Sequence, residues 1–154
     1  MIAYGSRAKV VISFNRTLPS LQNWLSTLEK MPIERGTPAL EKALQEAKTL
    51  FQISARKDAK KVLVVIADKS PIGDQQTVWK EARDLEYDDV KVVPVAIGDE
   101  IDPTEIAGVS PYRDVLVDVP KDVDPKELAG LVMDKVFIGT VVLLISLLSS
   151  FPLI

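Results

Sequence analysis

Residues 61–68, with the sequence KVLVVIAD, decide how this chain is expected to fold. Val62 to Ala67 form an uninterrupted apolar run of strand length and mostly β-branched composition, which is typical of a parallel strand covered on both faces. Asp68 ends the run and begins a turn-rich loop. After residue 36, helix-like and strand-like segments alternate, at 38–51, 62–67, 77–85 and 90–97, then in a short helix that begins at 103, and then at 114–119 and 125–136. This alternation predicts an α/β fold with a mostly parallel sheet and helices on both faces.

The sequence also marks where several of these segments begin. Thr37 is placed to be the N-cap of the helix that follows it. Residues 102–105 (DPTE) and 124–127 (DPKE) each combine an N-cap acid, a Pro and the Glu of a capping box, so each predicts a helix start. Pro94 has no N–H to give to a ladder, and we expect it where its strand lies at an edge or a bulge.

The composition excludes several classes of function. The chain has 154 residues, of which 47% are hydrophobic, enough to bury one core. It carries 22 acidic and 19 basic residues, and no stretch gathers the basic ones, so we expect no nucleic-acid partner. The chain has no Cys and no His, which removes thiol nucleophiles, the usual zinc ligands and imidazole acid–base chemistry. A small hydrolase or phosphatase is therefore disfavoured, and we predict that the chain is not an enzyme.

Two oxygen-bearing side chains fall where a parallel sheet binds its ligands. Such ligands lie at the carboxyl ends of the strands; Asp68 directly follows a strand and Thr37 precedes a helix. A carboxylate and a hydroxyl are oxygen donors of the kind that Mg²⁺ prefers. A capping Thr and an Asp that ends a strand also occur in many folds that bind no metal. The acidic loop at Asp99, Glu100 and Asp102 is interpreted as a solvated surface rather than an acid–base set.

The order of these segments resembles a von Willebrand factor type A domain. Residues 61–68 (KVLVVIAD) and 90–101 (VKVVPVAIGDEI) resemble the second half of that fold, and residues 4–14 (YGSRAKVVISF) resemble its second strand. Residues 36–40 (GTPAL) resemble the Gly-Thr helix start of the family. The resemblance covers about residues 2–136 and is greatest to the extracellular-matrix and collagen-type members. It implies a three-layer, Rossmann-like sheet and a role in adhesion or protein–protein interaction.

The resemblance also implies a metal-ion-dependent adhesion site, where a divalent cation bridges the domain to an acidic group of a partner. By correspondence, Thr37 and Asp68 would be two of the metal ligands, and the partner would bind around Thr37, Asp68, Ser70, Asp99 and Glu100. The other ligands of the family lie in a D-x-S-x-S loop after its first strand, and this chain starts at what resembles the second strand. We therefore expect Mg²⁺ or another divalent cation to bind weakly, in about the millimolar range.

The missing first strand has a consequence for the sheet. In the family this strand is central, between the second strand and the strand that matches Val62 to Ala67. Its loss leaves two long apolar strand edges without partners. We expect either that Ala8 to Phe14 moves beside Val62 to Ala67, or that the gap stays open and the isolated chain aggregates.

The segment 137–154 (FIGTVVLLISLLSSFPLI) carries no charge and departs from the family pattern. Together with Val136 it would span about 28 Å as a helix, close to the thickness of a membrane core. We therefore divide the chain into a partial type A domain at 1–136 and a hydrophobic C-terminal segment at 137–154, interpreted first as a transmembrane helix that associates the chain with a membrane. A lipid-anchor signal, a buried core segment and a tail without a selected role are the alternatives.

Together these features predict a non-catalytic adhesion or protein-binding module with an incomplete metal-ion-dependent adhesion site. Its partner would be a protein, such as a component of the extracellular matrix, and its location extracellular or membrane-associated. The alternative is a cytoplasmic type A domain that serves as a scaffold for complex assembly, because the first residues do not read as a secretion signal.

Overall fold

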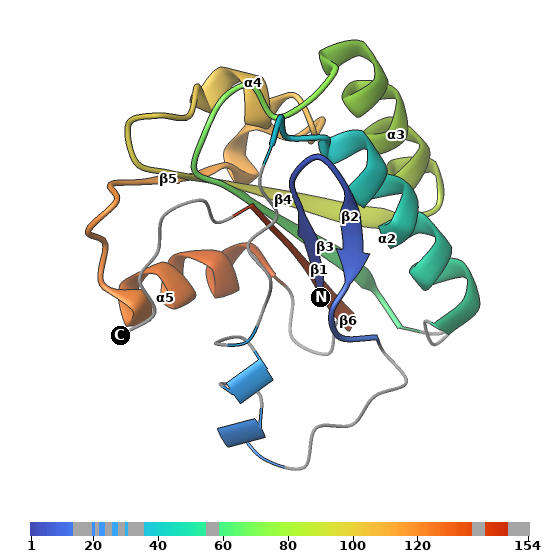
Figure 1. The fold of residues 1–154 in the computed structure, drawn as a ribbon, viewed down its shortest axis with the longest axis horizontal. Coiled ribbons are helices and arrows are strands. Elements are labelled where there is room, and N and C mark those ends of the chain that lie inside the picture. Colours follow the sequence, from blue (N-terminus) through green and yellow to red (C-terminus); the bar gives the residue numbers. More distant parts are fainter. Residues whose placement is uncertain are drawn as a thin grey trace.

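The computed structural model describes residues 1–13, 20, 22–23, 26–27, 30, 36–54, 59–136 and 141–147. Its strands are β1 (Ile2–Tyr4), β2 (Ala8–Val10), β3 (Lys61–Ala67), β4 (Val90–Ile97), β5 (Val117–Val119) and β6 (Val141–Leu147). Its helices are α2 (Leu40–Ser54), α3 (Gln75–Tyr87), α4 (Pro103–Ala107) and α5 (Pro125–Lys135), with a 3-10 turn, η1, at Arg113–Val115. Figure 1 shows these elements as one sheet with helices on both faces.

Among the described residues, the sheet has six strands in the order β2-β1-β6-β3-β4-β5. Neighbouring strands from β1 to β5 are parallel, and only β2 is antiparallel to its neighbour β1. The α/β class and the mostly parallel sheet predicted from the sequence are confirmed.

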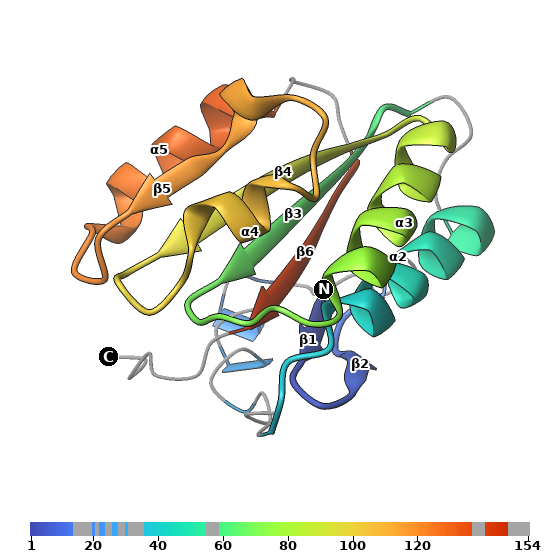
Figure 2. The ribbon, with the colours of Figure 1, turned by 90° about the horizontal axis from the view of Figure 1, so that it is seen from above.

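The strand β3 supplies side chains to both faces of the sheet, as its uninterrupted apolar run predicts. One core cluster packs α2, α3 and α4 against Leu63, Val65 and Ala67. The other packs Val62 and Val64 with strands β4 and β5 and with the apolar side chains of α5. Figure 2 shows the same division, with α2 and α3 on one face and α5 on the other.

Pro94 lies at a place in β4 where one side of the strand has no ladder partner. It is paired with Val65 of β3, whereas the ladder between β4 and β5 runs only from Val95 to Ile97. At Pro94, the side of β4 that faces β5 is therefore a free strand edge. This agrees with the expectation for a proline, which has no N–H to donate to a ladder.

The gap expected in the sheet is closed by a different strand from the one we expected. Strand β2 spans Ala8–Val10, pairs with β1 alone and does not move beside β3, while Phe14 lies outside the described residues. The strand β6 instead lies between β1 and β3, where the resemblance places the missing first strand. The prediction for Ala8 to Phe14 was wrong, because β6 supplies hydrogen-bond partners to the edges of both β1 and β3.

This placement also corrects the interpretation of residues 137–154 as a membrane-spanning helix. Residues 141–147 are hydrogen-bonded as a strand on both sides, so they are not helical. Residues 137–140 and 148–154 lie outside the described part. Among the helices of the described residues, none is both long and apolar enough to cross a membrane.

Candidate functional site

The carboxyl ends of the parallel strands bring together the loops that carry the predicted site residues. The Ala39 N–H donates to the Gly5 carbonyl (2.8 Å), and the Leu40 N–H donates to the Ile72 carbonyl (2.9 Å). These bonds join the turn after β1, the start of α2 and the loop after β3. Thr37 and Asp68 therefore lie in neighbouring loops at one end of the sheet, which we call the carboxyl edge.

Thr37 is exposed and lies outside helix α2, which begins at Leu40. The residue before it, Gly36, has a φ of +109° and packs against Ser6, so the chain turns sharply at this point. The N–H groups of Ala39 and Leu40 at the helix start are bonded to loop carbonyls. The predicted N-cap role of Thr37 was wrong, because neighbouring loops supply these acceptors.

Ser70 and Glu105 form the polar centre of the carboxyl edge. The Ser70 hydroxyl donates to Glu105 Oε2 (2.6 Å) and accepts from the Asp102 N–H (2.9 Å), and the buried Ile72 donates its N–H to Glu105 Oε1 (3.0 Å). Glu105 thus binds the loop after β3 to the start of α4. The sequence analysis missed this role, since it took Glu105 as the last residue of a local capping box.

The acidic loop after β4 is exposed at the carboxyl edge. Asp99 and Glu100 are exposed, and Glu100 forms a 3.6 Å ion pair with the exposed Lys69. Asp102 caps α4 as predicted, and hydrogen bonds from the Thr104 side chain and N–H lower the pKa of Asp102. The loop therefore presents negative charge at the surface, while one of its carboxylates is engaged in holding a helix.

A buried tyrosine lies beneath these loops. Tyr4 ends β1 and is fully buried, and its hydroxyl has no hydrogen-bond partner among the described residues. Burial raises the pKa of Tyr4 far above its usual value, and the charges of Asp68, Glu105 and Glu41 raise it further. The phenol therefore stays protonated at physiological pH, and the carboxylates around it give the interior of the edge a negative potential.

The described donors do not fit a resident divalent cation. Thr37 and Asp68 together offer one hydroxyl and one carboxylate, and Mg²⁺ needs about six oxygen ligands in near-octahedral geometry. In the part of the chain that the structure describes, no three Asp, Glu, His or Cys side chains form a group that could hold a metal ion. We therefore assign no metal-dependent step to this edge.

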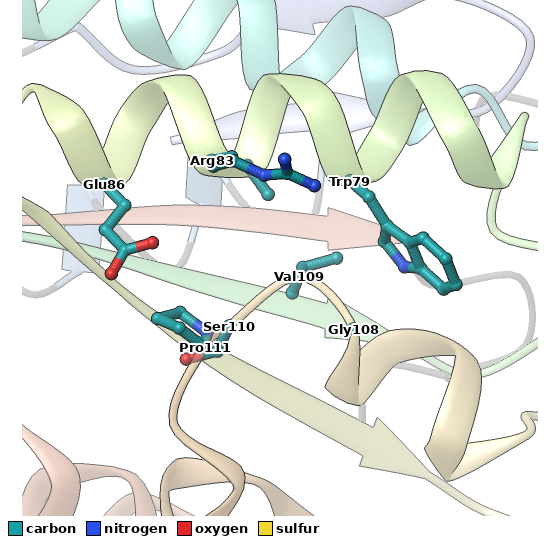
Figure 3. A pocket seen from close by; sticks show the side chains of 8 residues that line it. Trp79, Arg83, Glu86, Gly108, Val109, Ser110 and Pro111 are labelled. Atoms are coloured by element: carbon teal, nitrogen blue, oxygen red, sulfur yellow. The ribbon is translucent and has the colours of Figure 1, made fainter.

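A separate groove lies between α3 and the loop that follows α4 (Figure 3). A cavity of about 340 Å³ is lined by Trp79, Arg83 and Glu86 of α3 and by residues 108–111. The Trp79 ring leans over Gly108, so closely that a Cβ at Gly108 would lie 2.2 Å from the indole Nε1. Arg83 and Glu86 bring opposite charges to the rim, and the Ser110 hydroxyl accepts a hydrogen bond from the Tyr112 N–H (3.3 Å). The groove thus offers a surface for contact, with Trp79 38% exposed.

Comparison with known proteins identifies the family to which the chain is similar. Residues 1–114 match the model of the von Willebrand factor type A domain. Proximal thread matrix protein 1 from the mussel byssus superposes with a TM-score of 0.69 at 16% identity, over 87% of this chain and 34% of that chain. Another structure of the same protein, with a zinc-occupied MIDAS motif, has a TM-score of 0.66 at 15% identity, over 87% of this chain and 32% of that one.

The SpRpn10 VWA domain is also similar, with a TM-score of 0.62 at 18% identity over 86% of this chain and 69% of that chain. This chain spans only about a third of the length of the byssus protein. At such identities the similarity to these structures shows the fold alone.

Proposed function

This chain belongs to the von Willebrand factor type A family, and from that premise we propose that it is an adhesion module that binds another protein through the carboxyl edge. Type A domains are typically non-catalytic modules that mediate protein binding. The observation that carries the proposal is the convergence of four chain segments at this edge: the turn after β1, the start of α2 and the loops after β3 and β4.

The chemistry of the edge indicates what kind of partner fits it. Asp99 and Glu100 are exposed, whereas Ser70 is half-buried and bonded to Glu105. The exposed carboxylates would contact the partner, and the Ser70–Glu105 pair would hold the loop that presents them. An edge with exposed carboxylates favours a basic surface on the partner, such as a Lys- or Arg-rich segment of a matrix protein.

Dependence on a cation separates two versions of this function. An extracellular adhesion module of this family would need a divalent cation, for which Thr37 and Asp68 alone supply few ligands. A cytoplasmic scaffold of the same family would bind its partner without a metal. Because no three metal-ligating side chains form a group in the described part of the chain, the scaffold is the alternative that the test must separate from the adhesion module.

Binding of the full chain to a panel of immobilised matrix proteins, with Mg²⁺ or with EDTA, tests the proposal. The edge variant Asp99→Asn/Glu100→Gln is compared with Glu46→Gln/Asp89→Asn, a pair of exposed acids away from the edge. Both variants remove two negative charges. We expect the edge variant to weaken binding about fivefold, since two exposed ion pairs together contribute about 1 kcal/mol.

Each outcome of this experiment has a definite meaning. Loss of binding in EDTA and its return at millimolar Mg²⁺ supports the adhesion module, whereas binding that EDTA leaves unchanged supports the scaffold. Equal weakening by the edge and the control variants would mean that net charge alone drives binding, and would reject the carboxyl edge as the contact surface.

A further inference from the structure

The outer face of helix α3 carries exposed side chains of the kinds that dominate protein interfaces. Trp79, Arg83 and Tyr87 recur at every fourth position, so they lie along one stripe of the helix. All three are exposed, Trp79 by 38% and Tyr87 by 83%, while the opposite face of the helix packs into the core. Trp, Tyr and Arg are the residues most enriched at the energetic centres of protein interfaces. The stripe therefore has the composition of a contact surface.

Trp79 also lies where three hollows of the surface meet. One, of about 340 Å³, is lined by Trp79 together with residues 108–111 (Figure 3). A second, of about 510 Å³, reaches the start of α4 at Pro103, and a third, of about 400 Å³, has Arg83 and Tyr87 in its lining. Hollows of a few hundred cubic ångströms are of the size that proteins use to bind small ligands. We use the name α3 groove for Trp79, Lys80, Arg83, Tyr87 and residues 108–111.

The exposed charges of α3 are positive. Lys80 and Arg83 are exposed, and neither forms an ion pair with a residue that the structure describes. The acids of the helix are half-buried instead, at Glu81, Asp84 and Glu86. A partner that approaches this face therefore meets the two cations first, although the chain as a whole has a net charge of −3.

Two of the three acids are engaged by helix α2. The Gln45 amide donates to Glu81 (3.0 Å), and Lys48 pairs with Asp84 (3.1 Å). Glu86 lines the hollow beside residues 108–111, whereas the hollow with the two cations has Asp84 as the acid in its lining. Because Lys48 already neutralises that acid, this part of the groove presents a net positive charge.

We propose that the α3 groove is a docking site for a short acidic segment of a partner protein, with an apolar side chain against the Trp79 ring and carboxylates beside Lys80 and Arg83. Charge complementarity selects this occupant, because a basic segment would bring like charges next to both exposed cations. From Trp79 to Tyr87 the helix advances about 12 Å, the length of about four residues of extended chain. The carboxyl edge favours a basic surface instead, so the two sites can be tested independently.

Fluorescein-labelled peptides of about seven residues, mixed with the full-length chain, test this site. One set places Leu, Phe or Trp between flanking Glu residues. A second set replaces the flanking Glu by Lys, and a third keeps the Glu but has Ser at the centre. Fluorescence anisotropy gives the dissociation constant of each peptide. We expect the acidic peptides with an apolar centre to bind at least about tenfold more tightly than either control set, because only they complement both the ring and the cations.

Variants of the chain locate the binding on the groove. Trp79→Ala should weaken binding of the acidic peptides by about tenfold or more, because it removes the ring that the apolar side chain contacts. Lys80→Gln/Arg83→Gln should weaken it about fivefold, because it removes two exposed ion pairs. Trp79→Phe, which keeps an aromatic ring, should retain most of the binding.

The matched controls lie in α5 and in the loop before it. Met133→Ala removes an exposed apolar side chain, and Lys121→Gln/Lys126→Gln removes two exposed cations. Neither control should change the dissociation constants, and far-UV circular dichroism checks that every variant keeps the fold.

Three results would overturn the proposal. The first is failure of every acidic peptide to bind, and the second is equal binding of the peptides with flanking Lys. The third is an effect of the groove variants no larger than that of their matched controls. If Trp79→Ala does not fold, Lys80→Gln/Arg83→Gln decides between the groove and the rest of the surface.

Discussion

Replacing Glu105 by Ala should destabilise the domain far more than its place on a five-residue helix would suggest. The carboxylate accepts hydrogen bonds from the Ser70 hydroxyl and the Ile72 N–H, both in the loop after β3. The substitution removes both bonds and leaves the N–H of the buried Ile72 without its acceptor. It therefore acts on the contact between two loops rather than on the helix itself.

The size of the effect follows from these two bonds. A hydrogen bond to a charged group contributes about 1.5–3 kcal/mol. Because Glu105 is only half-buried, water screens part of this energy, and we expect Glu105→Ala to cost about 2–4 kcal/mol of a total stability of about 5–15 kcal/mol. Glu105→Gln keeps an acceptor for the Ile72 N–H and should cost about 1 kcal/mol.

Urea unfolding followed by tryptophan fluorescence and far-UV circular dichroism measures this difference. Glu100→Ala is the matched control, because Glu100 is an exposed neighbour whose 3.6 Å ion pair with Lys69 should contribute less than about 1 kcal/mol. The reasoning is refuted if Glu105→Ala loses no more stability than Glu100→Ala, or if the Gln variant is as unstable as the Ala variant.

Four further predictions concern other parts of the domain. Tyr4→Phe should leave the urea midpoint unchanged or raise it, since the buried hydroxyl it removes has no hydrogen-bond partner among the described residues; a loss above about 1 kcal/mol would contradict this. Gly108→Ala should shift the tryptophan fluorescence emission, because the new Cβ would displace the indole of Trp79. Gly130→Ala has open space around it, and it should stabilise α5 by about 0.5–1 kcal/mol in the urea unfolding assay. Hydrogen bonds from Thr77 lower the pKa of Asp74. This carboxylate therefore stabilises the fold above about pH 4, and the stabilisation is lost as the pH falls through the lowered pKa. Asp74→Asn should make the free energy of unfolding depend less on pH over that range, and an unchanged midpoint of acid unfolding would argue against this.

Much of the fold was predictable because its signals are local. The apolar run of β3 predicts a strand that is buried on both faces, and both core clusters contain its side chains. Asp102 and Asp124 each accept hydrogen bonds from backbone N–H groups in the first turn of the helix that follows. Strand β5 is an instructive partial success: the strand predicted over 114–119 forms only at Val117–Val119, because the residues before it turn as η1. Alternation of polar and apolar residues does not by itself reveal where a turn ends and a ladder begins.

The candidate site was only partly predictable. The sequence places Thr37 and Asp68 in loops at strand and helix ends, and the structure brings these loops to one edge. The role of Glu105 depends on Ser70, which lies 35 positions earlier in the chain. No local pattern marks that pair, since its two members meet only when α4 packs beside the loop after β3.

The amino-acid sequence alone determined the α/β class, the strand and helix starts set by short-range patterns, and the lack of imidazole and thiol chemistry. Only the tertiary structure decided which strand fills the centre of the sheet. Residues 141–147 carry an uncharged run that suits a membrane helix and a buried strand equally well. The choice depends on partners at β1 and β3, whose hydrogen-bonding edges are separated from this run by much of the chain and exist only once the sheet has formed.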